Sequence, residues 1–162
     1  MRILRSLGLL LLALPLFACA PFADGTAEHA VPAMTYFLSA SLYYPDTDGS
    51  VTRVERTFPW EYEMEKGVLD ALKEAPRDGL LPALPLGVSY RILLRGADAT
   101  VDILDLPAFT DEATERACIA CVVDTLLSLA HVDSVQLLFN GERVSALKYG
   151  TKVYDPFTAQ LP

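Results

Sequence analysis

Apolar and polar residues alternate with period two in four segments of the chain, which is the pattern of half-buried β-strands. These segments are 34–44, 51–58, 88–95 and 99–103. Turn-forming residues from Pro45 to Gly49 separate the first two segments, and Gly96 begins a turn between the last two. The pattern therefore predicts two β-hairpins, with Asp102 on the outward face of the second.

In two other segments the apolar residues recur every three or four positions, which predicts amphipathic helices. The first helix is expected between Pro59, which fits a first helical turn, and Pro76, which cannot continue a helix. Its apolar side consists of Met64, Val68, Ala71, Leu72 and Ala75. The second helix is expected over residues 111–130, with Thr110 as its N-cap. Its buried stripe consists of Ile119, Val122, Val123, Leu126 and Leu129.

A last apolar strand is expected at residues 134–139. Asn140-Gly141 after it indicates a type I′ turn that leads to a short strand at 142–145. The element order is thus ββαββαβ with a short β after it. Because two helices can cover only one face of a sheet, the sequence predicts an α/β (α+β) fold. It is a two-layer sandwich, with both helices on one face of a mixed sheet of about four to six strands.

The first residues have the features of an export signal and not of a fold element. Arg2 and Arg5 precede a short apolar run, and the sequence LFAC that ends at Cys19 resembles a bacterial lipobox. We expect residues 1–18 to be a lipoprotein signal peptide. Cys19 then becomes the lipidated N-terminus, and its acyl chains hold the protein at the membrane. An ordinary cleaved signal with a chance cysteine is the alternative, and the run is short for a transmembrane helix.

Residues 19–33 are rich in Ala, Pro and Gly and show no periodicity, which predicts a flexible linker after the lipidated cysteine. His29 in this linker is not expected to be a ligand. Residues 34–162 then form one domain of ordinary size. Without residues 1–18 the chain has 11 basic and 21 acidic residues, a net charge of −10. Such acidity opposes binding to nucleic acid or to an anionic membrane surface.

Two clusters could carry chemistry. Cys118 and Cys121 form a C-x-x-C pair inside the second predicted helix, away from the helix N-terminus that depresses a thiol pKa. We expect small buried side chains, and a disulfide or a redox role stays open. Glu61, Glu63 and Glu65 are spread around the first helix by their spacing, which favours a solvated face over a metal site.

His131 stands at the expected end of the second helix, where it can interact with the last carbonyl groups. The sequence has no phosphate-binding glycine motif, no zinc-ligand set and no nucleophile signature, so we expect no catalytic residue, metal or cofactor. The alternation places Arg56 on the same strand face as Val54 and Phe58. Arg56 either pairs with an acid at a sheet edge or meets a partner's carboxylate, and it is the one candidate binding residue.

Several blocks together resemble the GerMN domain, a family named for a lipoprotein of bacterial spore germination and sporulation. The blocks span about residues 36–158 and are LYYPDTDG, VERTFPWEYEMEKGVLDALKEAPRDGLLPALPLGVSY, GADATVDI, LLSLAHVDSVQLLFNGERV and YDPF. Their most specific part is Gly79, Leu80, Pro85 and Gly87, followed by Gly96, Val101-Asp102 and 135–141. The glycines and prolines of residues 79–87 are expected to turn the chain from helix to hairpin.

The resemblance implies an α/β fold similar to the ring-building domains of sporulation machinery, in lipoproteins outside the cytoplasmic membrane. It implies no enzymatic activity and no catalytic residues. The protein that names the family carries the domain twice, whereas residues 34–162 have room for one. In addition, His131 stands where a small glycine often ends the second helix.

We therefore expect a non-catalytic, membrane-tethered extracytoplasmic lipoprotein that acts as an assembly module in sporulation, spore germination or cell-envelope processes. It would associate with itself or with envelope or sporulation proteins. The alternative is an envelope lipoprotein that binds a cell-wall fragment or another small ligand, with aromatic residues such as Tyr36 and Trp60 stacking on sugars. An envelope hydrolase is the third reading, and it would need a convergent catalytic set in a chain with two histidines.

Overall fold

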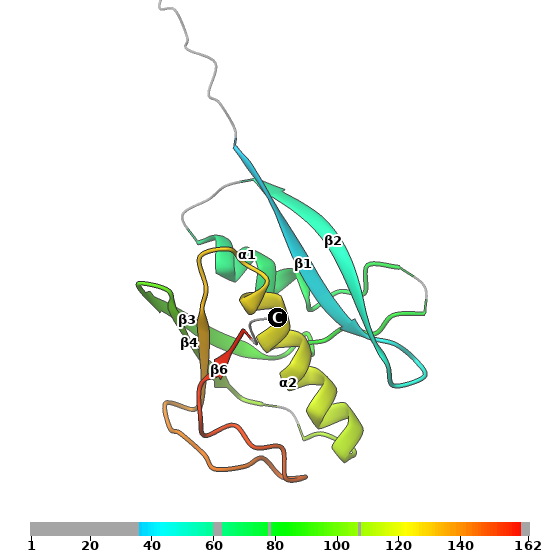
Figure 1. The fold of residues 1–162 in the computed structure, drawn as a ribbon. Coiled ribbons are helices and arrows are strands. Elements are labelled where there is room, and N and C mark those ends of the chain that lie inside the picture. The colour runs from blue at the N-terminus through cyan, green and yellow to red at the C-terminus, as the bar shows by residue number, and fades with distance from the viewer. Residues whose placement is uncertain (1–35, 60–62, 78, 107, 160–162) are drawn as a thin grey trace, which may run out of the picture. The chain divides into compact units, whose positions relative to one another are not determined.

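The computed structural model describes residues 36–59, 63–77, 79–106 and 108–159, which belong to one compact unit, 34–162. The described strands are β1 (Phe37–Pro45), β2 (Val51–Pro59), β3 (Ser89–Arg95), β4 (Asp98–Leu104), β5 (Ser134–Phe139) and β6 (Phe157–Thr158). The helices are α1 (Met64–Ala71) and α2 (Glu112–Leu127). Figure 1 shows both helices on the same side of the sheet that contains β3 and β4.

Four strands form a mixed sheet in the order β3-β4-β5-β6. β3 and β4 are an antiparallel hairpin, whereas β5 runs parallel to β4. A parallel neighbour needs a long crossover connection, and α2 supplies it. β6 pairs antiparallel with the first two residues of β5. The predicted α+β fold with a mixed sheet and two helices is therefore confirmed.

β1 and β2 form a separate two-stranded antiparallel sheet, with Phe37 opposite Pro59 and Pro45 opposite Val51. This sheet packs on α2 instead of extending the mixed sheet. Polar contacts fix it there, because the Tyr43 N–H donates to the Thr125 hydroxyl (3.0 Å). As a result, α2 has the four-stranded sheet on one side and the β1–β2 hairpin on another (Figure 1).

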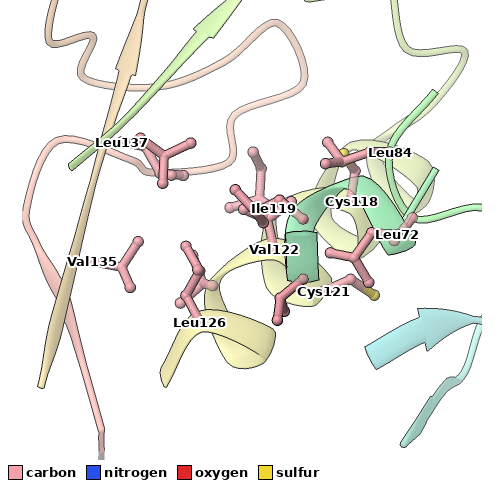
Figure 2. Packing of buried hydrophobic residues seen from close by; sticks show 14 of the residues in the cluster. Leu72, Leu84, Cys118, Ile119, Cys121, Val122, Leu126, Val135 and Leu137 are labelled. Carbon is pink, nitrogen blue, oxygen red and sulfur yellow. The ribbon is translucent and has the colours of Figure 1, made fainter. Parts of the chain in front are cut away.

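The core lies between α2 and its neighbours. Figure 2 shows Val135 and Leu137 of β5 pointing toward Ile119, Val122 and Leu126 of α2. All five side chains are buried, as are the remaining two residues of the predicted helix stripe, Val123 and Leu129. The inward row of β4 is also as predicted, with Ala99, Val101 and Ile103 buried. The apolar periodicity therefore identified this core correctly.

Two predicted element ends are wrong. Pro59 does not begin the first helix but ends β2, and α1 begins at Met64. A proline is tolerated at a strand end because it needs no ladder partner for its nitrogen. The N-cap of α2 is Asp111 and not Thr110, since the Asp111 carboxylate accepts from the Thr114 N–H (2.8 Å). A carboxylate there also faces the positive end of the helix dipole.

The turn after β5 has the predicted form. Asn140 and Gly141 both have positive φ, 52° and 82°, as a type I′ turn requires. The Asp102 carboxylate accepts from the Gly141 N–H (2.7 Å), so the outward-facing aspartate braces the turn. The prediction of a short strand at 142–145 is wrong. After the turn the chain pairs back with β5 through a single bridge, between Phe139 and Glu142. The last short strand is instead β6, which lies in the C-terminal segment that follows this turn, called the tail below.

No helix among the described residues has the length and apolar character needed to cross a membrane.

Candidate functional site

Several predicted features fall outside the described residues. These are the signal peptide at 1–18, the lipidated Cys19, the linker at 19–33 with His29, and Trp60 and Glu61 in the segment before α1. They remain predictions from the sequence. The other candidate residues can be placed.

The two described members of the acidic cluster, Glu63 and Glu65, have different partners. Glu63 pairs with Lys66 (3.2 Å) on the surface. The prediction of a solvated face is wrong for Glu65, whose side chain is largely buried and whose carboxylate lies 2.6 Å from Nε2 of His131. Among the described residues no group of three or more His, Cys, Asp or Glu side chains could hold a metal ion.

His131 lies three residues beyond Ser128, the C-cap of α2, and its Nε2 contacts Glu65 of α1. The sequence predicted contacts with the last helix carbonyls, because it could not show that α1 comes close. The contact with Glu65 joins α1 to the segment just after α2, and the expected contacts with the helix carbonyls stay a prediction. The Glu65–His131 pair is a contact between two elements of the fold.

Cys118 and Cys121 are free thiols buried in the core. Burial raises the pKa of the Cys118 thiol to about 12. Burial, together with the neighbouring Cys118 and Asp124, raises the pKa of Cys121 to about 12 as well. The two sulfur atoms lie apart in Figure 2, with Cys118 near Leu84. These environments are opposite to the thiolate-stabilising one of a redox pair.

Arg56 is exposed on β2, opposite Ala40 of β1. Its guanidinium stands over the Phe58 ring, 5.4 Å from the ring centroid. Burial raises the pKa of Tyr44, and the positive charge of Arg56 acts against that rise, which places Arg56 close to the Tyr44 hydroxyl. Arg56 makes no ion pair with a described carboxylate, so the expected acid at the sheet edge is not found in the part of the chain that can be described.

Residues 79–87, rich in Gly and Pro, tie three elements together. Gly79 has φ of +89°, which other residues rarely adopt, and its carbonyl accepts from the Thr47 N–H (3.2 Å) in the β1–β2 turn. The Leu72 carbonyl at the end of α1 accepts from the N–H groups of Ala83 (2.9 Å) and Leu84 (3.1 Å). The expected architectural role of this stretch is therefore observed.

The same stretch lines a cavity of about 500 Å³ between the β1–β2 turn and the start of α2. Its wall is mainly apolar and includes Leu81, Pro82, Phe109, Ala113 and Ala117. Among the described lining residues the charged ones are Asp46, Asp48 and Asp111, and none is a lysine or arginine. The cavity thus suits a small apolar group that is neutral or positively charged, and not an anion.

Glu115 is a functional-looking residue that the sequence analysis missed. It is fully buried on α2, and its carboxylate accepts from the N–H groups of Tyr149 (2.9 Å) and Thr151 (3.1 Å). Burial acts to raise its pKa, but these hydrogen bonds outweigh burial, and the pKa lies below its ordinary value. Its partners are both in the tail, so Glu115 anchors the tail to the helix and is not a candidate acid or base.

The open edge of β3 is a second feature that the sequence did not single out. β3 has β4 on one side, and no described strand pairs with its other side. A groove of about 640 Å³ runs along this edge. It is lined by Tyr90, Arg91, Ile92, Leu93 and Leu94 of β3 and by Glu63, Glu65 and Lys66 at the start of α1. Leu93 is 53% exposed there, which is unusual for a large apolar side chain.

These features define an α+β domain with a mixed sheet, two helices and a β3 edge that no described strand covers. The family model of Germane, described as sporulation and spore germination, matches residues 41–145. The chain therefore belongs to this family.

Solved structures support the fold. The first GerMN domain of the sporulation protein GerM from Bacillus subtilis is 21% identical, with a TM-score of 0.66, over 75% of this chain and 98% of that one. The tandem GerMN domains of the same protein match with the same identity and TM-score over 76% of this chain and 46% of theirs. A Clostridium perfringens protein described as a lipoprotein is 15% identical, with a TM-score of 0.53, over 76% of this chain and 88% of that one. A comparison with curated protein sequences gave no match.

Proposed function

We propose that this protein is a lipid-anchored extracytoplasmic module that assembles with other envelope proteins in sporulation, spore germination or a related cell-envelope process, without catalysis of its own. The observation that carries the proposal is the open edge of β3. Its outward main-chain groups lack a described strand partner, and a groove with both apolar and charged lining residues lies beside it. An exposed strand edge of this kind is a template for pairing with another chain.

The non-catalytic part of the proposal rests on what the described polar side chains already do. Glu115 holds the tail, Asp111 caps α2 and Asp102 braces a turn. The His131 ring contacts Glu65, and the raised thiol pKa values of the two core cysteines oppose nucleophilic chemistry. Each of these groups has a structural task, so a reaction centre would have to be built from other residues.

The anchoring part of the proposal rests on the lipobox-like sequence that ends at Cys19. The Clostridium perfringens protein of similar fold is described as a lipoprotein, which agrees with such a location. Two acyl chains on one cysteine would hold the domain at the outer face of the membrane far more firmly than one chain would. The acidic domain would gain no help from anionic lipid headgroups.

Crosslinking in native cells tests the proposal. The wild-type chain, recovered by affinity after crosslinking, is expected to bring envelope or sporulation proteins with it. Cys19→Ala is expected to lose them, since the domain is no longer held beside them. Cys118→Ala, which also removes one thiol but keeps the anchor, is the matched control. Recovery of the wild-type protein alone and monomeric contradicts the proposal.

The cavity lined by residues 79–87 favours a second candidate function, the binding of a small ligand such as a cell-wall fragment. Its volume of about 500 Å³ falls in the range of ligand sites. Its three aspartates favour a neutral or amine-bearing fragment. Thermal shift measurements with neutral and amine-bearing wall fragments are expected to raise the melting temperature of wild type but not of Ala117→Phe, which fills the cavity. Equal shifts in both proteins, or none in wild type, contradict this candidate.

A further inference from the structure

We infer that the open edge of β3 pairs with an extended segment of a partner protein in which acidic residues alternate with aliphatic ones. This inference rests on the proposed assembly function and names the kind of partner. It is argued from the hydrogen-bonding register of β3, from the side chains on its two faces, and from charges that oppose self-pairing.

The register shows which main-chain groups are available. Two residues connect Arg95 to its partner Asp98, so this pair exchanges hydrogen bonds and every second pair does the same. The N–H and C=O groups of Tyr90, Ile92 and Leu94 therefore point away from β4. These three residues supply donors and acceptors for one added strand of about five residues.

The side chains of β3 set what that strand must offer. Tyr90, Ile92 and Leu94 are half-buried toward α1, and the Tyr90 hydroxyl donates to the Lys66 carbonyl (3.0 Å). An added strand would lay aliphatic side chains beside this row, in the groove. On the other face Arg91, Leu93 and Arg95 are exposed. The remaining side chains of the added strand, every second one, would lie beside Arg91, Leu93 and Arg95.

The arginines select acids for those alternate positions. Arg91 stands opposite Asp102 and Arg95 opposite Asp98 on β4. Asp102 already accepts from the Gly141 N–H, and Asp98 accepts from the Ser134 hydroxyl. Neither arginine makes an ion pair with any carboxylate in the described part of the chain. Opposite charges across neighbouring strands are stabilising, so carboxylates on the added strand fit this face.

The same arginines oppose pairing of β3 with β3 of a second copy. An antiparallel pair centred on Ile92 places Arg91 diagonally across from its own copy, at about 7–8 Å. Shifting the pair by two residues in either direction places arginine directly opposite arginine. Like charges at these positions destabilise a strand pair. The partner is therefore a different segment and not a second β3.

The outer edge of β2 also has no described strand beside it, but it lacks these features. Its exposed charges include Arg53 and Glu55, which pair with each other. Arg56 stands over Phe58, and the groove described above runs along β3. β2 thus offers neither a free pair of like charges nor an adjoining groove for aliphatic side chains.

A model peptide tests the chemistry on the purified lipidated chain in detergent. The probe is a labelled seven-residue peptide of alternating glutamate and valine, and its counterpart has lysine for glutamate. Fluorescence anisotropy is expected to show at least about tenfold tighter binding of the acidic peptide. N-methylation of alternate peptide nitrogens is expected to abolish binding, because strand pairing needs those donors.

Charge reversal gives the matched comparison. Arg91→Glu with Arg95→Glu is expected to reverse the preference toward the lysine peptide. Arg77→Glu with Arg143→Glu makes the same charge change at exposed sites off the strand and is expected to leave the preference intact. An unchanged preference in the β3 variant, or no binding of either peptide to wild type, overturns the inference. Normal melting of both variants shows that the edge, and not the fold, was altered.

Photocrosslinking in native cells identifies the segment. A photoreactive amino acid in place of exposed Leu93 is expected to capture a segment of another protein with alternating acidic and aliphatic residues. The same replacement at Leu86, which is 75% exposed in a loop, is the control. Capture of a second copy, of residues 19–33 of the same chain, or of a segment without acids overturns the inference.

The two proposals can fail separately. If wild type recovers envelope partners and the Arg91 and Arg95 reversal leaves recovery unchanged, the edge inference is wrong and the assembly function stands. If wild type recovers no partner at all, the assembly function is wrong and the inference falls with it.

Discussion

Glu115 is the one charged residue among the buried polar residues that the structure describes. Its side chain is fully buried on α2 and satisfied by two main-chain N–H groups from the segment that follows β5. A buried carboxylate with such donors is costly to disturb, because loss of the acceptor leaves the donors unpaired. Glu115 therefore couples the position of the tail to that of the helix.

Glu115→Gln is expected to lower the free energy of unfolding by about 1–3 kcal/mol at pH 7, because one oxygen acceptor is replaced by a donor that faces an N–H group. Urea unfolding measures it. Glu112→Gln, at an exposed pair with Arg116, is the control and is expected to change stability by less than about 0.5 kcal/mol. An equally small effect at Glu115 would contradict the role assigned to the carboxylate.

The stability difference between wild type and Glu115→Gln is expected to depend on pH in a definite direction. The folded pKa of Glu115 is lowered, so the carboxylate contributes its full stabilisation above the unfolded pKa of about 4.3. The stabilisation is lost as the pH falls through the folded pKa. The gap between wild type and Glu115→Gln is thus expected to be constant from pH 6 to 7 and to shrink below about pH 4. A gap that widens on acidification would show the opposite shift.

The two core cysteines are expected to be unreactive while the protein is folded. In Cys19→Ala they are the only thiols, and burial raises the pKa of each to about 12. Ellman's reagent at pH 8 is expected to find no accessible thiol in the folded chain and two after unfolding in guanidinium. Rapid reaction in the folded state, or a mass two daltons lower, would instead indicate a reactive pair or a disulfide.

At the scale of elements, α2 owes its composition to its position between two sheets. Ile119, Val122 and Leu126 meet the mixed sheet, whereas Thr125 receives the Tyr43 N–H of β1. The Ser128 hydroxyl at the helix end donates to the Ser41 carbonyl (2.9 Å). A helix buried on more than one side needs small or satisfied polar residues where the hairpin backbone approaches, and Thr125 and Ser128 meet that need.

Thr125→Val is expected to destabilise the protein by about 1–3 kcal/mol, because it preserves shape but leaves the Tyr43 N–H without an acceptor. Hydrogen exchange at Tyr43 is expected to accelerate more than exchange in β4. Thr100→Val, on a strand and without a side-chain hydrogen bond to a described residue, is the control and is expected to be nearly neutral. Equal exchange rates in both variants would show that the hairpin does not depend on this contact.

At the scale of the whole described domain, one core joins strands, helices and the connection at 79–87. Leu72 and Leu84 meet this core from the α1 side, and Leu137 meets it from β5 (Figure 2). No described element can therefore be loosened without exposing apolar surface of another. Such a scaffold holds the edge of β3 in a fixed shape, which reduces the ordering cost of adding a strand.

Leu137→Ala is expected to lower the free energy of unfolding by about 2–5 kcal/mol, because it leaves a cavity in the middle of this core. Leu86→Ala removes the same atoms from a side chain that is 75% exposed and is expected to change stability by less than about 0.5 kcal/mol. Chemical denaturation of both variants checks the difference. A small loss at Leu137 would mean that β5 is not the centre of the sheet.

Much of the fold followed from local patterns. The alternation in 88–95 and 99–103 predicted the β3–β4 hairpin, and Asn140-Gly141 predicted the turn after β5. The 3.6-residue period located the buried stripe of α2. These predictions succeeded because periodicity and turn preference depend on a few neighbouring residues and on which face is buried.

The candidate site was less accessible to such reasoning. In the sequence Glu115 looks like an ordinary surface glutamate, because the contacts that bury it come from the tail. The pairing of Glu65 with His131 joins residues far apart in the chain. The sequence around Arg56 did not predict that Arg56 lies near Tyr44. Contacts of this kind depend on the path of the chain in space, which no local pattern records.

The sequence by itself determined the order of elements, the core faces of the strands and helices, the family resemblance and the acidic character of the chain. Only the tertiary structure decided that β1–β2 forms its own sheet on α2, that Glu115 and His131 are bound into the fold, and that β3 is left at an open edge. The physical reason is that burial sets which side of an element faces inward, whereas strand neighbours are chosen by long-range packing and hydrogen bonds.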